Sequence, residues 1–357
     1  MLNKKVLIAM SGGVDSSASA YLMKEKGYDC IGCTMKLYQN EDAGMPKGHT
    51  CCSLDDIEDA RAVARTLGIP YYVFNFSDDF RSKIINHFIW SYEHGRTPNP
   101  CIDCNRYMKF EKLFERAKIL GCDLVVTGHY ARIEKQNGRY ILKKAADLSK
   151  DQSYVLYTMT QEQLAHTAFP LGGFHKTQIR EIARKQGFYN SEKPDSQDIC
   201  FVPDGDYAKV IRLRGGKAPE TGYFVDTAGK VLGTHKGIFR YTIGQRKGIG
   251  IPFCEPHYVC AVDAESNTVT VDTAEHLFRT ELLADDFNWT AGTPPQKTIR
   301  CKAKIRYRQK EQWAYAEIRD DGIVCVRFDE PQRAITPGQA VVLYDGDTVL
   351  GGGTIEK

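Results

Sequence analysis

Apolar residues in the first half of the chain alternate between short continuous runs and stretches with helical spacing. The short runs predict strands at 5–10, 29–37, 71–76 and 123–127. Apolar residues three and four positions apart predict helices at 16–26, 54–67, 79–93 and 108–120. Strands that alternate with helices in this way are typical of an α/β fold, a parallel sheet with helices on both faces.

The pattern changes near residue 205, where apolar and polar positions begin to alternate in short runs between turn signals. Such runs predict mostly β structure. We therefore expect an α/β domain at 1–205 and a small, mostly-β linking domain at 206–275. A C-terminal β-barrel is expected at 276–357, with a β-sandwich as the alternative.

The composition is that of a soluble globular protein, with 357 residues of which 42% are hydrophobic and 26% charged. The net charge of +3 is too small to indicate nucleic-acid binding by itself. No apolar stretch approaches the ~20 residues that span a bilayer, so we expect a cytoplasmic protein without a membrane partner. In a reducing compartment the twelve cysteines are not expected to form a disulfide framework.

The segment 11–17, Ser-Gly-Gly-Val-Asp-Ser-Ser, lies between the first predicted strand and the first predicted helix. Gly12 and Gly13 have no Cβ, so the backbone can turn tightly and approach an anion closely. The N–H groups of a helix start point at such an anion, and the three serine hydroxyls add donors. Asp15 is a candidate ligand for Mg²⁺. The segment lacks the Gly-Lys-Ser/Thr ending of a Walker A loop and the Gly-x-Gly-x-x-Gly pattern, so it predicts another kind of phosphate loop.

This segment resembles the loop of the PP-loop ATP pyrophosphatases, which split ATP into AMP and pyrophosphate, often by adenylating an oxygen that is then displaced. Further segments narrow the resemblance: 95–105 (GRTPNPCIDCN), 127–130 (TGHY), 150–153 (KDQS), 195–201 (DSQDICF), 241–250 (YTIGQRKGIG), 306–308 (RYR), 328–331 (FDEP) and 336–339 (TPGQ). In order and spacing they are similar to the tRNA-specific 2-thiouridylases over essentially the whole chain. The resemblance implies a tRNA sulfurtransferase. It would adenylate the C2 oxygen of the wobble uridine in tRNAs for Lys, Glu and Gln, and sulfur would then replace that oxygen.

The resemblance also implies roles for matching positions. The residues implied to contact ATP are Ala9, Met10, Ser11, Gly12, Gly13, Val14, Asp15, Ser16, Met35 and Gly128. Those implied to lie beside the target base are Asn99, Pro100 and Cys101, and those implied to contact tRNA are His129, Lys150, Asp151, Gln152, Arg306, Tyr307 and Gln339. Cys200 would carry a persulfide that Cys104 attacks. The implied cofactors are ATP and Mg²⁺, and the implied sulfur donor is a cysteine desulfurase or a sulfur-relay protein.

The residues themselves support these roles more weakly. Asn99 and Pro100 force an extended turn, so Cys101 and Cys104 are expected on a constrained loop. A Cys-x-x-Cys spacing commonly lowers a thiol pKa, and such a pair is more often metal-binding or redox-active than structural. His129 could equally be a hydrogen-bonded histidine at the end of a strand.

Basic residues recur at every second position near the start of the last domain: Arg300, Lys302, Lys304, Arg306, Arg308 and Lys310. Alternate side chains of a strand share a face, so these residues predict one basic stripe with Tyr307 on the opposite side. Such a stripe can neutralise phosphates, and a merely solvated strand face is the alternative.

Many members of the resembled family have aspartate where this chain has Cys101. The three thiols of Cys101, Cys104 and Cys200 suit a [4Fe–4S] cluster with one open iron, since ordinary sites take four cysteines. Zinc is a rival occupant. A persulfide relay through Cys104 and Cys200 alone is the third hypothesis. Cys51 and Cys52, in a loop near the predicted ATP site, have helix-start packing as their expected role.

Two other functions compete with tRNA thiolation. A PP-loop amidotransferase or synthetase that acts on a small metabolite would require neither the thiols nor the basic stripe. A tRNA-binding module with a relic nucleotide fold would have a degraded loop, whereas residues 11–17 are intact.

Overall fold

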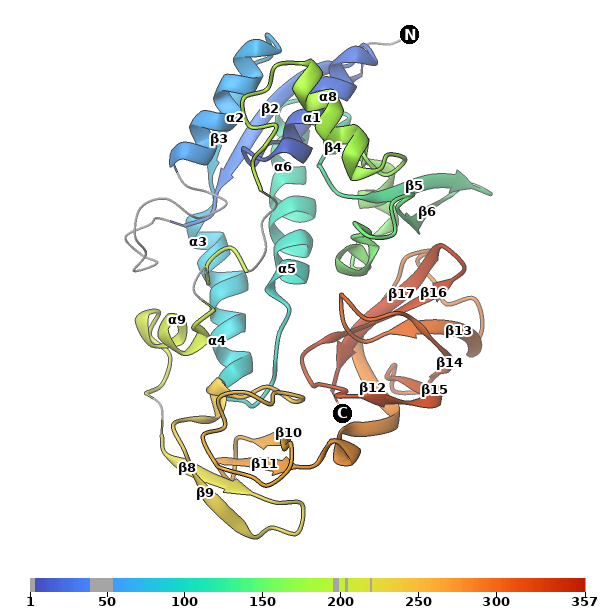
Figure 1. Cartoon of the computed structure of the whole chain (residues 1–357). Coiled ribbons are helices and arrows are strands. Elements are labelled where there is room, and N and C mark those ends of the chain that lie inside the picture. Colours follow the sequence, from blue (N-terminus) through green and yellow to red (C-terminus); the bar gives the residue numbers. More distant parts are fainter. Residues whose placement is uncertain (1–3, 39–53, 195–198, 203–204, 219, 357) are drawn as a thin grey trace.

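The computed structural model describes residues 4–38, 54–194, 199–202, 205–218 and 220–356. Its N-terminal part is built on a sheet that is parallel throughout (Figure 1). In spatial order the strands are β3 (Tyr71–Asn75), β2 (Asp29–Lys36), β1 (Lys5–Ala9), β4 (Leu124–Val126) and β7 (Thr167–Ala168). The predicted α/β fold is confirmed.

Helices cover both faces of this sheet. They are α1 (Val14–Glu25), α2 (Leu54–Thr66) and α8 (Lys176–Lys185) on one face and α6 (Leu113–Ile119) on the other. The alternation of side chains along β1 explains the arrangement, because Val6 and Ile8 pack with α1 and α2 while Leu7 packs with Leu113 and Ala117 of α6. Val6, Leu7 and Ile8, the three middle residues of β1, are fully buried, as expected of a central parallel strand.

Two long helical segments run from the sheet toward the other domains. Their consecutive parts are α3 (Ser77–Phe80), the π-helical turn η2 (Arg81–Ile85) and α4 (Asn86–Glu93), then α5 (Pro100–Asp103), the π-helical η3 (Cys104–Lys112) and α6. The second segment begins earlier than predicted. Pro100 occupies its first turn, where the missing N–H costs nothing, and the Asn99 side chain accepts a hydrogen bond from the Cys101 N–H at 3.2 Å. Cys101 and Cys104 therefore lie in the first turns of a helix, and the prediction of a loop was wrong.

The C-terminal part is a closed barrel, as predicted. Its strands in spatial order are β12 (Phe278–Trp289), β15 (Val324–Arg333), β14 (Gln312–Ile318), β13 (Thr298–Lys304), β16 (Ala340–Asp345) and β17 (Thr348–Ile355), and β17 pairs with β12 to close the ring. A hairpin from the first half of the chain, β5 (Ala131–Gln136) and β6 (Arg139–Lys144), extends the barrel sheet where Lys143 pairs with Thr348. The sequence analysis did not predict this hairpin.

The residues between these two parts of the sequence form a small sheet. Its strands in spatial order are β10 (Tyr258–Asp263), β11 (Thr268–Asp272), β8 (Gly222–Val225) and β9 (Val231–His235). It has its own apolar core, which includes Phe224, Val259 and Val269. The remaining helical elements are η4 (Ser153–Leu156), α7 (Gln161–Ala165), α9 (Tyr207–Leu213), η5 (Ile238–Arg240) and η6 (Ala274–Leu277). Within the described residues, every helix is too short or too polar to cross a membrane.

The barrel contacts the N-terminal part through the loop before β16. The Thr97 N–H donates to the Pro337 carbonyl at 2.9 Å, and the Gln339 side chain donates to the Thr97 carbonyl at 2.8 Å. Gly338 lies between them with φ +88°, and a Cβ on it would lie 3.0 Å from the Thr97 nitrogen. The chain just before Asn99 is thus fixed by a loop of the barrel.

We expect Gly338→Ala to destabilise the protein by about 1–3 kcal/mol more than Gly346→Ala, because the added methyl must push the two loops apart. Gly346 is a matched control: it also has a positive φ, +57°, but a Cβ there would meet nothing within 4 Å. The measurement is the free energy of unfolding by urea. Equal losses for the two variants would contradict a close contact at Gly338.

Candidate functional site

The loop between β1 and α1 has the geometry of an anion site. Gly12 has φ +73°, and a Cβ on it would lie 2.5 Å from the Asp56 carbonyl oxygen, so only glycine fits there. Gly13 precedes α1 and has no side chain to cap it. The N–H groups of the first helical turn can therefore receive an anion.

Two of the three loop serines form hydrogen bonds within the loop itself. Ser16 and Ser17 are buried, and their hydroxyls donate to the Gly13 carbonyl at 2.9 and 3.1 Å. Asn190, which the sequence analysis missed, donates to the Gly12 carbonyl and to the Ser17 hydroxyl, both at 2.9 Å. These hydroxyls fix the turn, so the backbone N–H groups at the start of α1 are the stronger candidates for binding an anion.

Asp15, the acidic residue of the loop, is engaged within the protein. Both of its carboxylate oxygens accept hydrogen bonds from the Lys176 ammonium, each at 2.8 Å. The Tyr130 hydroxyl donates to the same carboxylate at 2.8 Å. A magnesium ion on Asp15 would have to compete with this ammonium.

The other residues implied to contact ATP gather at the carboxyl ends of β1, β2 and β4, where α/β sheets bind ligands. Ala9 pairs with Cys33, and the Met10 N–H continues the pairing to the Cys33 carbonyl at 2.7 Å. Gly128 follows β4 and packs against the backbone of Asp15, since a Cβ on it would lie 3.0 Å from the Asp15 carbonyl carbon. The implied ATP set is thus one contiguous group.

Cys104 and Cys200 border the same apolar cluster, but Cys101 is not grouped with them. Cys104 and Cys200 are half-buried and pack against one apolar cluster that contains Phe80, Phe88 and Phe201. Cys101 is exposed at the start of α5. In the part of the chain that the structure describes, no three His, Cys, Asp or Glu side chains lie close enough together to hold a metal ion.

The hypotheses of a [4Fe–4S] cluster or a zinc ion on the three cysteines therefore have no ligand set in this structure. The physical reason is that Cys101 lies on the solvent side of the helix start, whereas Cys104 faces the apolar cluster. Cys51, Cys52 and residues 195–198 lie outside the described residues.

Three of the residues implied to contact tRNA bond within the N-terminal part. His129 is 6% exposed and lies 2.6 Å from the Thr127 hydroxyl and 3.3 Å from the Lys109 ammonium. Burial, with the charge of Lys109, holds the pKa of His129 well below its usual 6.5.

The Asp151 carboxylate accepts hydrogen bonds from the Ala145 and Ser153 N–H groups, and the Gln152 side chain accepts one from the Tyr130 N–H. Contact with RNA stays a prediction for all three.

The basic stripe is only half as long as predicted. Arg300, Lys302 and Lys304 alternate along β13, but the strand ends at Lys304 and the chain turns. Beyond the turn, Arg306 points inward to the carbonyls of Ile243 and Ala334. Burial lowers the pKa of Arg306, as expected of a cation removed from water. Alternate spacing was read as one strand, and this interpretation was wrong beyond residue 304.

The outer face of the barrel instead combines cations with aromatic rings. The Arg300 guanidinium lies 4.8 Å from the Trp313 ring centre and 4.6 Å from that of Tyr315. Both rings are 50% exposed, and Lys302 lies 5.2 Å from Trp313. Rings and cations on one exposed face suit nucleic acid, which offers bases for stacking and phosphates for charge pairing.

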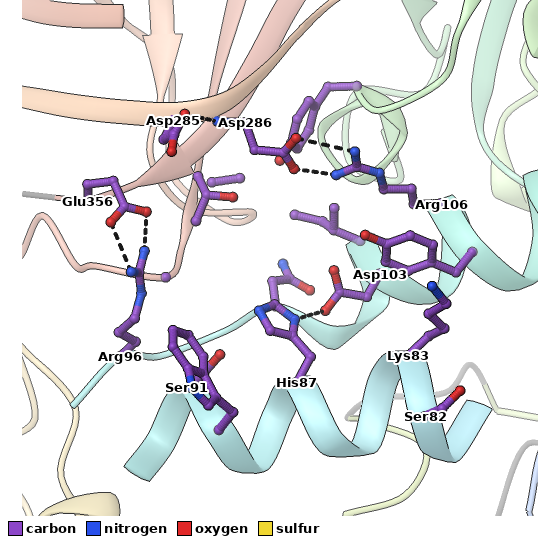
Figure 2. Close-up of a pocket in the computed structure, with 18 residues that line it drawn as sticks. Ser82, Lys83, His87, Ser91, Arg96, Asp103, Arg106, Asp285, Asp286 and Glu356 are labelled. Carbon is purple, nitrogen blue, oxygen red and sulfur yellow. Dashed lines mark hydrogen bonds and ion pairs between the residues drawn. The ribbon is translucent and has the colours of Figure 1, made fainter. Parts of the chain in front are cut away.

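A cavity of about 360 Å³ separates the helix start at Asn99 from the barrel (Figure 2). Ion pairs between Arg96 and Glu356 and between Arg106 and Asp286 join its two sides. The described residues of the phosphate loop do not line it, and neither do Cys104 and Cys200. This cavity is therefore distinct from the thiol site.

A glycine-rich anion loop at the carboxyl ends of parallel strands, with two thiols on a neighbouring apolar cluster, defines the protein as a nucleotide-binding α/β transferase. Family models match residues 4–204 (tRNA methyl transferase HUP domain), 213–273 (tRNA methyl transferase PRC-barrel domain) and 279–355 (aminomethyltransferase beta-barrel domain). The chain belongs to the tRNA-specific 2-thiouridylase family.

Its relatives match over the full length. The chain is 51% identical to a tRNA-specific 2-thiouridylase MnmA of Clostridioides difficile (strain 630), over 100% of this chain and 99% of that protein. It is 50% identical to the one from Acetivibrio thermocellus, over 100% of both chains. A solved 4-thiouridine synthetase–RNA complex with bound ATP is similar at a TM-score of 0.36 and 20% identity, covering 59% of this chain and 50% of that one.

Because the pKa of His129 is depressed in the folded protein, the unfolded chain binds a proton below pH 6.5 that the folded protein does not. This histidine should therefore cost stability as the pH falls below 6.5, by at most about 1.4 kcal/mol per pH unit. We expect His129→Gln to lose less stability than the wild type between pH 7 and pH 5.5. Free energies of unfolding at the two pH values test this, and parallel losses in both proteins would contradict it.

Proposed function

We propose that this chain is an ATP-dependent tRNA sulfurtransferase that converts the wobble uridine of tRNAs for Lys, Glu and Gln to 2-thiouridine. The observation that carries the proposal is the position of Met35. It lies on β2, beside the strand that leads into the phosphate loop, and packs against the same apolar cluster as Cys104 and Cys200. An activated nucleotide bound at the loop would therefore lie next to the thiols. A small-metabolite amidotransferase gives these thiols no role.

The first chemical step is activation of the base. The C2 oxygen of the uridine attacks the α-phosphorus of ATP and displaces pyrophosphate, which leaves the base adenylated. The backbone N–H groups at the start of α1 would hold the phosphates, and Gly128 lets the chain after β4 pack closely against the Asp15 backbone beside them. Mg²⁺ would be held by the phosphates and Asp15, and would supply positive charge against the leaving pyrophosphate.

The second step delivers sulfur. A donor persulfide transfers its outer sulfur to Cys200. The Cys104 thiolate then attacks the inner sulfur of that persulfide, forms a Cys104–Cys200 disulfide and expels hydrosulfide. Hydrosulfide attacks C2 of the adenylated base and displaces AMP, and a thiol reductant restores the two cysteines. The shared apolar surroundings of the two thiols support this relay.

The donor would be a cysteine desulfurase or a sulfur-relay protein, and the compartment the cytoplasm. Cys101 takes no part in the relay. It lies in the first turn of α5, beside the expected position of the base. The pKa of Tyr307 is raised by burial first, then by the charge of Asp151 and that of Cys101, which supports a position of Tyr307 near Cys101. We propose that Asn99, Pro100, Cys101 and Tyr307 surround the target base.

Cys104→Ser and Cys200→Ser should each lower tRNA thiolation by more than about 100-fold, because neither the nucleophile nor the persulfide carrier remains. The assay supplies ATP, tRNA and a persulfide donor, and it quantifies 2-thiouridine and AMP. Cys254→Ser, a change at an exposed cysteine of the small central sheet region, is the control and should leave thiolation unchanged. If Cys101→Ser abolishes thiolation together with bound iron, the relay is wrong and a cluster route replaces it.

Lys302→Ala and Arg308→Ala should weaken tRNA binding, because the first removes a half-exposed cation beside Trp313 and the second removes the exposed cation that follows Tyr307. Each lost phosphate contact should reduce the slope of log K against log salt concentration by about 0.9. Lys185→Ala, at an exposed lysine that pairs with Glu181 on α8, is the matched control. If the salt dependence of tRNA binding is unchanged in all three variants, this face of the barrel is a solvated surface and does not bind tRNA.

A further inference from the structure

A buried lysine reaches the phosphate loop from a distant part of the chain. Lys176 is the first residue of α8, and its side chain is 10% exposed. Its ammonium donates to both oxygens of Asp15, whose own side chain is 31% exposed. The ammonium is therefore held beside the second residue of α1, at the end of the helix that receives the anion.

The loop itself carries no cation. Residues 11–17 include neither lysine nor arginine. A polyphosphate is strongly anionic, and phosphate loops that end in Gly-Lys-Ser/Thr place a lysine on the outer phosphates for this reason. Backbone N–H groups and a helix dipole supply only partial charges. The site as built from the loop alone therefore lacks a full positive charge.

We propose that Lys176 supplies this missing cation and contacts the β- and γ-phosphates of ATP, which makes it a substrate-binding residue of the activation step. The inference rests on the proposed use of ATP. In the absence of nucleotide, Asp15 holds the ammonium in the site. When ATP binds, the ammonium turns from the carboxylate to the phosphates.

The backbone around Lys176 is fixed independently of its ammonium. Its N–H donates to the Asp147 carboxylate at 3.1 Å, and Asp147 is held in turn by the Ser149 hydroxyl at 2.6 Å. A lysine ammonium on a four-carbon stem can move by a few ångströms while its Cα stays in place. Asp15 does not lose all support when the ammonium leaves, because Tyr130 still donates to it and the start of α1 favours an acidic side chain.

The test compares the binding of ATP with that of AMP, which lacks the outer phosphates. Titration calorimetry on the full chain should show ATP binding weakened by about 10- to 100-fold in Lys176→Met, as expected for lost charge-assisted hydrogen bonds. AMP binding should change by less than about twofold. Lys176→Arg, which keeps the charge, should retain most of the ATP affinity, and Lys185→Met on the same helix should retain all of it.

A purely structural partner of Asp15 would behave differently, and a double-mutant cycle separates the two roles. In an Asp15→Asn background a structural lysine has no carboxylate left to hold, so Lys176→Met would cause no further loss of ATP affinity. We expect a further loss of about tenfold. The absence of that loss, or wild-type ATP affinity in Lys176→Met, overturns the lysine assignment alone. A wild-type protein that binds no ATP overturns the proposed function together with it.

Discussion

The chain just before Asn99 is held by the barrel, and the helix that carries Cys101 and Cys104 takes its position from that contact. Thr97 is bonded through both its N–H and its carbonyl to the loop 337–339. Asn99 then accepts the Cys101 N–H and starts the helix. The barrel, which is far away in the sequence, therefore positions Cys101 and Cys104. The local pattern of residues 95–105 could not predict this contact.

Bonds of the barrel to the other domains explain why two residues implied to bind tRNA are found inside the protein. Gln339 donates its side-chain N–H to the Thr97 carbonyl, and Arg306 joins the barrel to the central region through Ile243. Arg306 is followed by the exposed residue Tyr307 on the adjoining surface. A buried residue of this kind can affect RNA binding by holding its neighbour in place, which differs from a direct contact.

The parts of the fold that depend on local pattern could be predicted from the sequence. Alternating strands and helices gave the parallel sheet, and the two adjacent glycines at 12 and 13 gave the anion loop. The basic stripe was overextended because alternate spacing does not reveal where a strand ends, and here it ends at Lys304. Lys176 was missed because it meets Asp15 across 161 positions of sequence, and nothing local marks such a contact.

The start of the helix at Pro100 was mispredicted for a different reason. Asparagine followed by proline is a known helix-start signal, but it was interpreted as a turn. The grouping of Cys104 with Cys200, and the separation of Cys101 from both, depends on which way each side chain points from its helix. That property follows from the exact start of the helix, so an error of a few residues at Pro100 changed the expected ligand set.

The hairpin β5–β6 also bears on how the protein is made. Its second strand, β6, pairs with Thr348 in the last strand of the barrel, and Leu142 packs in one core with Val349. A ribosome synthesises residues 131–144 long before it reaches that strand. During this interval the hairpin has an unpaired edge and an uncovered apolar side, and such edges tend to pair with other chains. The hairpin therefore lacks its partner strand until β17 has left the ribosome.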